Sequence, residues 1–234
     1  MTYMDNSNDW DPFQTEKADR QKKRLEIPDS EKALEELQIH MSGQARRPFL
    51  GTQADLSQNE SSREFLHATN VFANFLRQQR AHYYPLGQSL GPKSKAFLAR
   101  FFDPALLGQV KIVKLTEGRV ANPPFFTEAR EKGYRNLPDL AHQSNVTFLD
   151  VVVFNEKITE RSLFHGLVHV TQVQILGMER FVELFVRGFQ HWKSYFMIPL
   201  KAHAFTLDCQ FAENRERGFS VESEVVRWME EGRY

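Results

Sequence analysis

The chain has 234 residues, 41% of them hydrophobic, and its 30 Lys and Arg residues balance 30 Asp and Glu residues. This length and apolar content suffice for a sizeable core, whereas the absence of net charge argues against nucleic acid and acidic membranes as partners. A single cysteine, Cys209, excludes an internal disulfide, and no apolar run reaches the ~20 residues needed to cross a bilayer, so we expect a cytoplasmic protein.

Residues 1–62 are expected to form a polar N-terminal extension that is partly disordered. They are rich in Asp, Asn, Gln and Ser, and contain one short helical candidate, KALEELQIHM. So few apolar side chains cannot offset the conformational entropy that is lost when such a segment becomes ordered. The folded domain is therefore predicted over residues 63–234. It begins with an amphipathic helix from Arg63 to His82, where apolar residues recur at helical spacing.

Two short strands are predicted in the middle of the chain, after a second helix over roughly Lys93–Phe102. The first strand is the β-branched segment Val110–Leu115, and the second, with the strongest strand signal, is Val146–Phe154 (VTFLDVVVF). Between them, Asn122-Pro123-Pro124 marks a loop because proline cannot donate to a β-ladder. Residues 130–141 are irregular and polar, and we expect them to border a cleft.

The last third of the chain is predicted to be helical. Thr159 is a good N-cap and Gly177 a good C-cap for a helix that ends at Leu176. Further helices are expected over Met178–Phe189, after Pro199, and over Val221–Glu231. Together with the two strands, these helices predict an α+β fold in which helices pack on a small sheet.

Two histidines lie four residues apart on the helix that Thr159 begins. Residues at this spacing share one helical face, so His165 and His169 can present two imidazoles to one metal ion. The usual hydrolytic form of the motif is His-Glu-x-x-His, in which the glutamate activates a metal-bound water. Here the position of the glutamate is occupied by Gly166.

The sequence around these histidines resembles a group of uncharacterised bacterial zincin-like proteins of the HExxH metallopeptidase type. The resemblance is carried by LFHGLVHVTQVQILGMERFVELFVRGF and the later YFMIPLKAHAF, against the patterns H-E-L-V-H-x-x-Q, L-G-x-E-x-F and I-P-L-E-x-x-A-Y. It covers roughly residues 100–215. It implies a zincin-like core in which His165 and His169 match the histidines that bind zinc.

This chain departs from the family pattern at two positions that the chemistry requires. Gly166 replaces the general-base glutamate, and Lys201 replaces the glutamate that would be the third metal ligand. A lysine ammonium has no lone pair for a metal and repels a divalent cation. We therefore expect either no cofactor or zinc on a histidine-only site.

A histidine-only site would need a third imidazole, and His203 is the candidate. Residues two apart on a helix project about 200° apart, so His203 faces away from the pair if Lys201 faces toward it. His142 and His191 lie in segments with loop character and are expected to be exposed. Gln172, one turn beyond His169, is expected to face the same cleft as a supporting amide.

A glycine inside a helix costs roughly 0.5–1 kcal/mol relative to alanine, so Gly166 is expected to make room either for a ligand or for the Lys201 side chain. The alternative is drift at a site that is no longer used. Our hypothesis is that the room serves Lys201, which would occupy the vacated metal site and hydrogen-bond the imidazoles. Cys209 is expected to be a small buried apolar side chain.

The sequence as a whole predicts a degenerate metallopeptidase homologue that is not an active peptidase and that binds a protein or peptide in the old cleft. The alternative is a metal-dependent enzyme with a histidine-only site (His165, His169 and His203) and no glutamate base. A third interpretation is metal-free catalysis by Lys201 together with a histidine.

Overall fold

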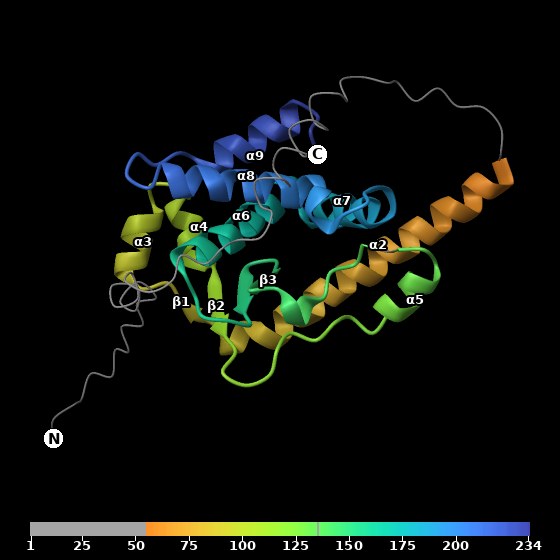
Figure 1. Ribbon diagram of the computed structural model, residues 1–234, viewed down its shortest axis with the longest axis horizontal. Coiled ribbons are helices and arrows are strands. Elements are labelled where there is room, and N and C mark those ends of the chain that lie inside the picture. Colours follow the sequence, from red (N-terminus) through yellow and green to blue (C-terminus); the bar gives the residue numbers. More distant parts are fainter. Residues whose placement is uncertain (1–54, 135) are drawn as a thin grey trace.

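The computed structural model describes residues 55–134 and 136–234. Residues 1–54 of the predicted extension, including its helical candidate, lie outside the described residues. The remaining residues, 55–62, belong instead to the first described helix. The described part is an α+β fold of eight α-helices around a four-stranded sheet, as predicted (Figure 1). The helices are α2 (Asp55–Tyr83), α3 (Pro92–Leu98), α4 (Pro104–Gln109), α5 (Phe126–Glu131), α6 (Glu160–Leu176), α7 (Met178–His191), α8 (Pro199–Glu213) and α9 (Val221–Glu230). The strands are β1 (Gln88–Ser89), β2 (Lys111–Lys114), β3 (Asn145–Phe148) and β4 (Val151–Phe154).

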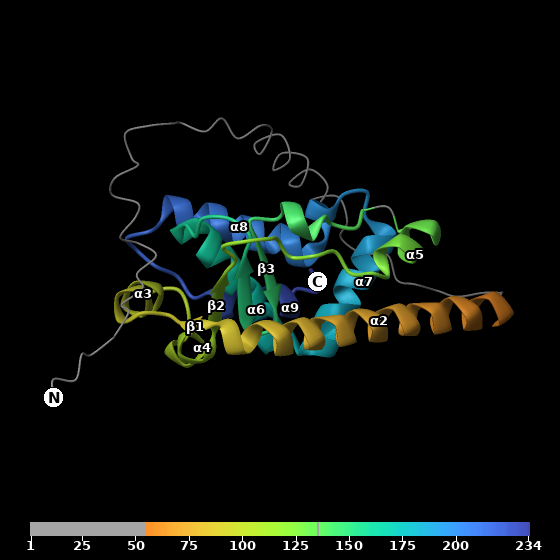
Figure 2. The same cartoon turned by 90° about the horizontal axis from the view of Figure 1, so that it is seen from below.

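Helix α2 is the longest described element and begins at Asp55, before the predicted start at Arg63. It ends at Tyr83, close to the predicted end at His82, and a 3-10 turn over Tyr84–Leu86 follows. Figures 1 and 2 show α2 running along one side of the sheet and beyond it toward α5 and α7. It therefore provides one wall of the molecule's interior, with contacts to α7 and β3.

The strand predicted over Val146–Phe154 is in fact a hairpin. Strands β3 and β4 are antiparallel neighbours in the order β1-β2-β4-β3, with Phe148 opposite Val151, so only two residues make the turn. One of them, Leu149, has φ of 60°, a left-handed conformation that non-glycine residues seldom adopt. The other, Asp150, accepts two hydrogen bonds from the Arg80 guanidinium of α2, at 2.7 and 2.8 Å. A contact with a distant helix thus holds the turn.

Strand β4 is buried on both of its faces, and this explains its continuous apolar sequence. Side chains alternate between the faces of a strand. Val152 and Phe154 belong to a cluster with α3, α4, α6 and α9, whereas Val151 and Val153 belong to a second cluster with α2 and α7. Strand β4 lies centrally and pairs in parallel with β2. Helices therefore cover both faces of the strands that adjoin α6.

Helix α6 begins and ends where its caps predict. The Thr159 hydroxyl accepts a hydrogen bond from the Ser162 amide, and the Ser162 hydroxyl accepts one from the Thr159 amide, which completes a capping box. At the other end, Gly177 has φ of 75°, a conformation that suits glycine. Helix α7 follows at once, with its predicted apolar residues buried, and α8 begins at Pro199 as predicted.

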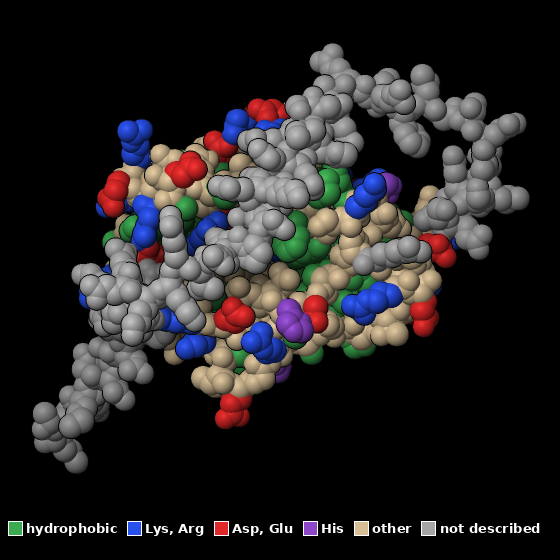
Figure 3. Space-filling model, viewed as in Figure 1, with side chains coloured by type: hydrophobic (Ala, Val, Ile, Leu, Met, Phe, Trp, Pro, Cys, Tyr) green, Lys and Arg blue, Asp and Glu red, His purple; other side chains and the backbone are tan. Residues whose placement is uncertain are grey.

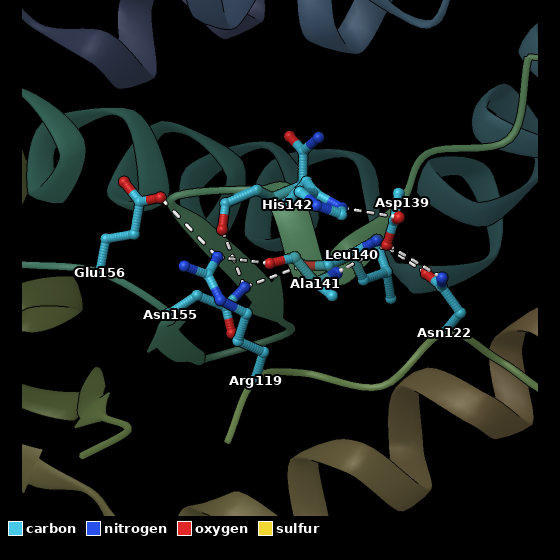
Figure 4. Close-up of polar contacts among 9 residues, drawn as sticks. Arg119, Asn122, Asp139, Leu140, Ala141, His142, Asn155 and Glu156 are labelled. Atoms are coloured by element: carbon cyan, nitrogen blue, oxygen red, sulfur yellow. Dashed lines mark hydrogen bonds and ion pairs between the residues drawn. The ribbon is translucent and has the colours of Figure 1, made fainter. Parts of the chain in front are cut away.

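The loop before β3 is fixed by an asparagine that directly follows β4 (Figure 4). The buried Asn155 accepts a hydrogen bond from the Val120 amide at 2.7 Å and donates to the carbonyls of Leu140 and Gln143, both at 2.8 Å. Asn122 supports the same loop by accepting from the Leu140 amide at 2.7 Å. The predicted irregular segment begins within α5, which ends at Glu131, and its other end at Leu140 is held by these hydrogen bonds next to the end of β4.

The surface is consistent with the balanced composition. On the face shown in Figure 3, Lys and Arg side chains are interspersed with Asp and Glu side chains. None of the helices that the structure describes is both long and apolar enough to span a bilayer. Cys209 is half-buried rather than fully buried, and burial raises the pKa of its thiol.

Candidate functional site

The predicted histidine pair lies on one side of α6. The ring centroids of His165 and His169 are 5.0 Å apart and the rings are nearly perpendicular. His169 is buried, with 3% of its surface exposed, whereas His165 is only half-buried and packs against Phe205 of α8. The inner imidazole, His169, is therefore the one enclosed by the protein.

Lys201 meets the inner histidine from the first turn of α8. Its Nζ atom lies 2.9 Å from Nε2 of His169, and the lysine is only 9% exposed. The ring of Tyr195 lies 5.1 Å from the same Nζ atom, within range of a cation–π interaction. The expected contact between Lys201 and the imidazoles is thus present for His169.

The hydrogen bonds of Gln172 determine which nitrogen of His169 carries the proton. Gln172 Nε2 donates to the carbonyl of Leu200 at 3.0 Å, and a carbonyl can only accept. Its Oε1 therefore faces His169 Nδ1, at 2.7 Å, and that nitrogen must donate. The lone pair of the neutral ring is then on Nε2 and is directed at Lys201. Gln172 supports the histidine as predicted.

Burial dominates the electrostatics of this group. It lowers the pKa of Lys201 from 10.5 to about 7. It also lowers the pKa of His169 well below its usual value, with a smaller effect from the neighbouring Lys201 charge. The pKa of His165 is lowered for the same two reasons. Both imidazoles are therefore neutral near pH 7, and at lower pH the positive charge of the group resides on the lysine.

His203 is not part of this group, in agreement with the helical geometry. Its ring stacks on Trp228 with centroids 3.9 Å apart, and its Nδ1 lies 2.6 Å from the Tyr234 hydroxyl. It is connected to the pair only indirectly, because Tyr234 also accepts a hydrogen bond from Gln172 at 3.4 Å. Burial lowers the pKa of His203 to about 3, so this ring is neutral as well.

The residues that would hold zinc do not fit that ion as they are arranged. His169 Nε2, the atom that would coordinate it, already accepts a hydrogen bond from Lys201. Within residues 55–134 and 136–234, no three His, Cys, Asp or Glu side chains are placed to hold a metal ion together. The other candidates, His142 and His191, are exposed, as predicted. The structure therefore does not assemble the histidine-only site of the alternative interpretation.

The room that Gly166 leaves is taken by the sheet, so the expectation that it serves Lys201 is wrong. A Cβ atom at this position would lie 2.6 Å from Val152 Cγ1 of β4 and 3.3 Å from Asn145 Oδ1 of β3. The Gly166 carbonyl also accepts a hydrogen bond from the Thr147 hydroxyl at 3.2 Å. Gly166 thus allows α6 to lie directly on the hairpin, and a glutamate would not fit there without displacing Val152.

A cavity of about 60 Å³ adjoins the lysine and the inner histidine. Its walls come from α2, α6, α7, α8, the β3 strand and the loop that Asn155 holds. Aromatic rings form much of the lining: Phe72, Phe75, Phe181, Phe185, Phe189 and Tyr195. Lys201 is thus placed at the edge of a partly open and largely apolar space.

Sequence reasoning did not identify two tyrosines that the structure brings to the site. Tyr195 lies in the segment that resembles the zincin-like pattern, but nothing in that pattern indicates its position over Lys201. Tyr234 is 62 residues from Gln172 along the chain, and no local signal predicts their contact.

Comparisons with protein-family models, curated proteins and solved structures give no match for this chain. The zincin-like resemblance therefore rests on the motif residues of the sequence alone.

Proposed function

We propose that this protein is a degenerate zincin-like metallopeptidase homologue that does not hydrolyse peptides and that acts by binding a ligand in the cavity beside Lys201. The observation that carries the proposal is the distance of 2.9 Å between Lys201 Nζ and His169 Nε2. The nitrogen that would ligate zinc in the family accepts a hydrogen bond from a lysine instead. The lysine amine stands where the sequence resemblance would put a carboxylate ligand.

The second support is the environment of Gly166. Peptide hydrolysis on zinc needs a general base that takes a proton from the metal-bound water. The backbone at the position of that base packs against Val152, and none of the described residues that line the cavity is an aspartate or glutamate. The described residues around the site therefore supply neither the third ligand nor the base.

The support for a binding function, as opposed to simple loss of activity, is that the site retains buried polar side chains that hydrogen-bond to one another. Gln172, His169 and Lys201 form a continuous hydrogen-bonded chain in the interior. A buried cation is costly to a fold, and an unused site would be expected to replace it with an apolar residue. Keeping the lysine is consistent with a ligand that uses its charge.

The test is the zinc content and peptidase activity of protein purified with zinc in excess. We expect far less than one equivalent of zinc and no cleavage of a fluorogenic peptide library. Lys201→Glu supplies the family's third ligand without placing a side chain against Val152, and we expect it to bind more zinc than the wild type. One equivalent of zinc with peptide cleavage in the wild type, both lost in His165→Ala, would refute the proposal.

A further inference from the structure

Lys201 is a buried cation for which the described part of the protein supplies no anionic partner. The Lys201 amine donates a hydrogen bond to the neutral His169 and lies over the face of the Tyr195 ring. No carboxylate of the described residues lies within ion-pair distance of its amine. Buried charges in proteins are normally paired, so an unpaired one at the wall of a cavity indicates a counter-charge that comes from a ligand.

The cavity lining reinforces this asymmetry of charge. None of the described residues around it is an aspartate, glutamate or arginine, and Lys201 is the single lysine among them. Besides His169 and Tyr195, the other polar side chains in the lining are uncharged and belong to β3 and the loop before it: Gln143, Asn145 and Thr147. Asn145 and Thr147 also donate hydrogen bonds to carbonyls of α6. The space thus combines one positive charge, a few neutral hydrogen-bonding groups and extensive apolar surface.

We infer that this cavity binds the carboxylate group of a small ligand with an apolar body, with the carboxylate on Lys201 and the body among the phenylalanines. This inference rests on the proposed binding function and names its ligand class. One lysine matches a single negative charge, whereas phosphate sites usually gather several cationic or backbone donors. The apolar lining matches a hydrocarbon body in place of a polar one such as a sugar.

The size of the ligand follows from the adjoining space. A second cavity of about 160 Å³, between α2, α5 and α7, shares Phe72, Phe126 and Phe189 with the first. An engineered apolar cavity of about 150 Å³ accommodates benzene. A carboxylate in the smaller space with a phenyl or short alkyl group directed toward the larger one therefore fits both volumes.

The experiment measures binding of 3-phenylpropanoate and hexanoate to the full chain by calorimetry and by protein NMR. The neutral 3-phenylpropanamide and the cationic 3-phenylpropylamine are compared with them. We expect the two carboxylates to bind and the amide and amine to bind at least tenfold more weakly. The tripeptide Ala-Ala-Phe, as the free acid and as the C-terminal amide, distinguishes a peptide carboxylate from a free small acid as the source of the same group.

Two variants locate the binding. Lys201→Met should weaken carboxylate binding by about 30-fold or more, which is the usual loss when one partner of a buried charge pair is removed. Lys114→Met is the matched control, because Lys114 is an exposed lysine of β2 that lines neither cavity. It should leave binding unchanged.

Equal binding of acid and amide, unchanged binding in Lys201→Met, or no binding of any carboxylate at millimolar concentration would overturn the inference. A metal-free, peptidase-inactive protein that binds no carboxylate would refute this inference alone and leave the proposed function standing.

Discussion

Replacing Lys201 by methionine should make the protein more stable. Methionine keeps an unbranched side chain of similar length and removes the charge. The pKa of Lys201 falls from 10.5 to about 7 because of burial, and at about 1.4 kcal/mol per pH unit this difference costs the fold roughly 5 kcal/mol below pH 7. The cost is fully present below the folded-state pKa and disappears as the pH rises from about 7 to about 10.5, where the unfolded chain also loses the proton.

One loss opposes this gain. Without Lys201, Nε2 of the buried His169 has no donor, which costs about 1–3 kcal/mol. The expected net effect of Lys201→Met is therefore an increase of about 2–4 kcal/mol in the free energy of unfolding near pH 6. The increase should shrink as the pH is raised toward 10.

The assay is urea unfolding of wild type and variant across this pH range, with Lys114→Met as the exposed control. The control should change stability by no more than about 0.5 kcal/mol. If Lys201→Met destabilises the protein by 2 kcal/mol or more near pH 6, or if its effect does not vary with pH, the lysine is a structural residue and the reasoning fails.

Three further predictions follow from individual contacts. Gly166→Ala should lower the free energy of unfolding by roughly 1–3 kcal/mol, because the new Cβ atom would overlap Val152. The loss should be smaller in a Val152→Ala background, and strictly additive effects in a urea double-mutant cycle would contradict the contact. Nitrogen-15 NMR should show neutral His169 with its proton on Nδ1, and Gln172→Leu should allow both tautomers; a proton on Nε2 in the wild type would contradict the hydrogen-bond chain. Burial raises the pKa of Asp208 to about 6 from 3.8, so its contribution to stability is most favourable below about pH 4 and is lost as the pH rises through 6. The stability of Asp208→Asn relative to wild type should therefore increase by up to about 3 kcal/mol between about pH 4 and 7. A difference that does not change with pH would refute the raised pKa.

The helices of the C-terminal third could be predicted because their signals are local. Thr159 and Ser162 are three residues apart and cap α6 with their own side chains, and Gly177 ends it with a positive φ. Pro199 likewise begins α8 at the first helical turn. These boundaries depend on residues that lie within one turn of each other, so a pattern in the sequence is sufficient.

The hairpin over β3 and β4 could not be predicted in the same way. An uninterrupted apolar segment is typical of a buried strand, and Leu149 gives no turn signal. The chain reverses there because Arg80, 70 residues earlier, holds Asp150, and because both faces of the sheet are covered by helices. Leu149 adopts a left-handed conformation that its own sequence does not favour.

The candidate site shows the same division between features that local signals predict and features that depend on residues far apart in the sequence. The placement of His169, Lys201 and Gln172 could be predicted from helical spacing together with the motif, and so could the outward direction of His203. The partner of Gly166 could not, because the atoms that fill its space belong to a strand and not to the neighbouring helix. A glycine inside a helix indicates a close approach but does not identify what approaches.

A crystal structure of the protein grown with zinc in excess tests the central claim most directly. The account predicts no metal peak between the rings of His165 and His169, with the Lys201 amine within hydrogen-bond distance of His169 Nε2. A zinc ion bound to both imidazoles, with Lys201 displaced from them, would contradict it.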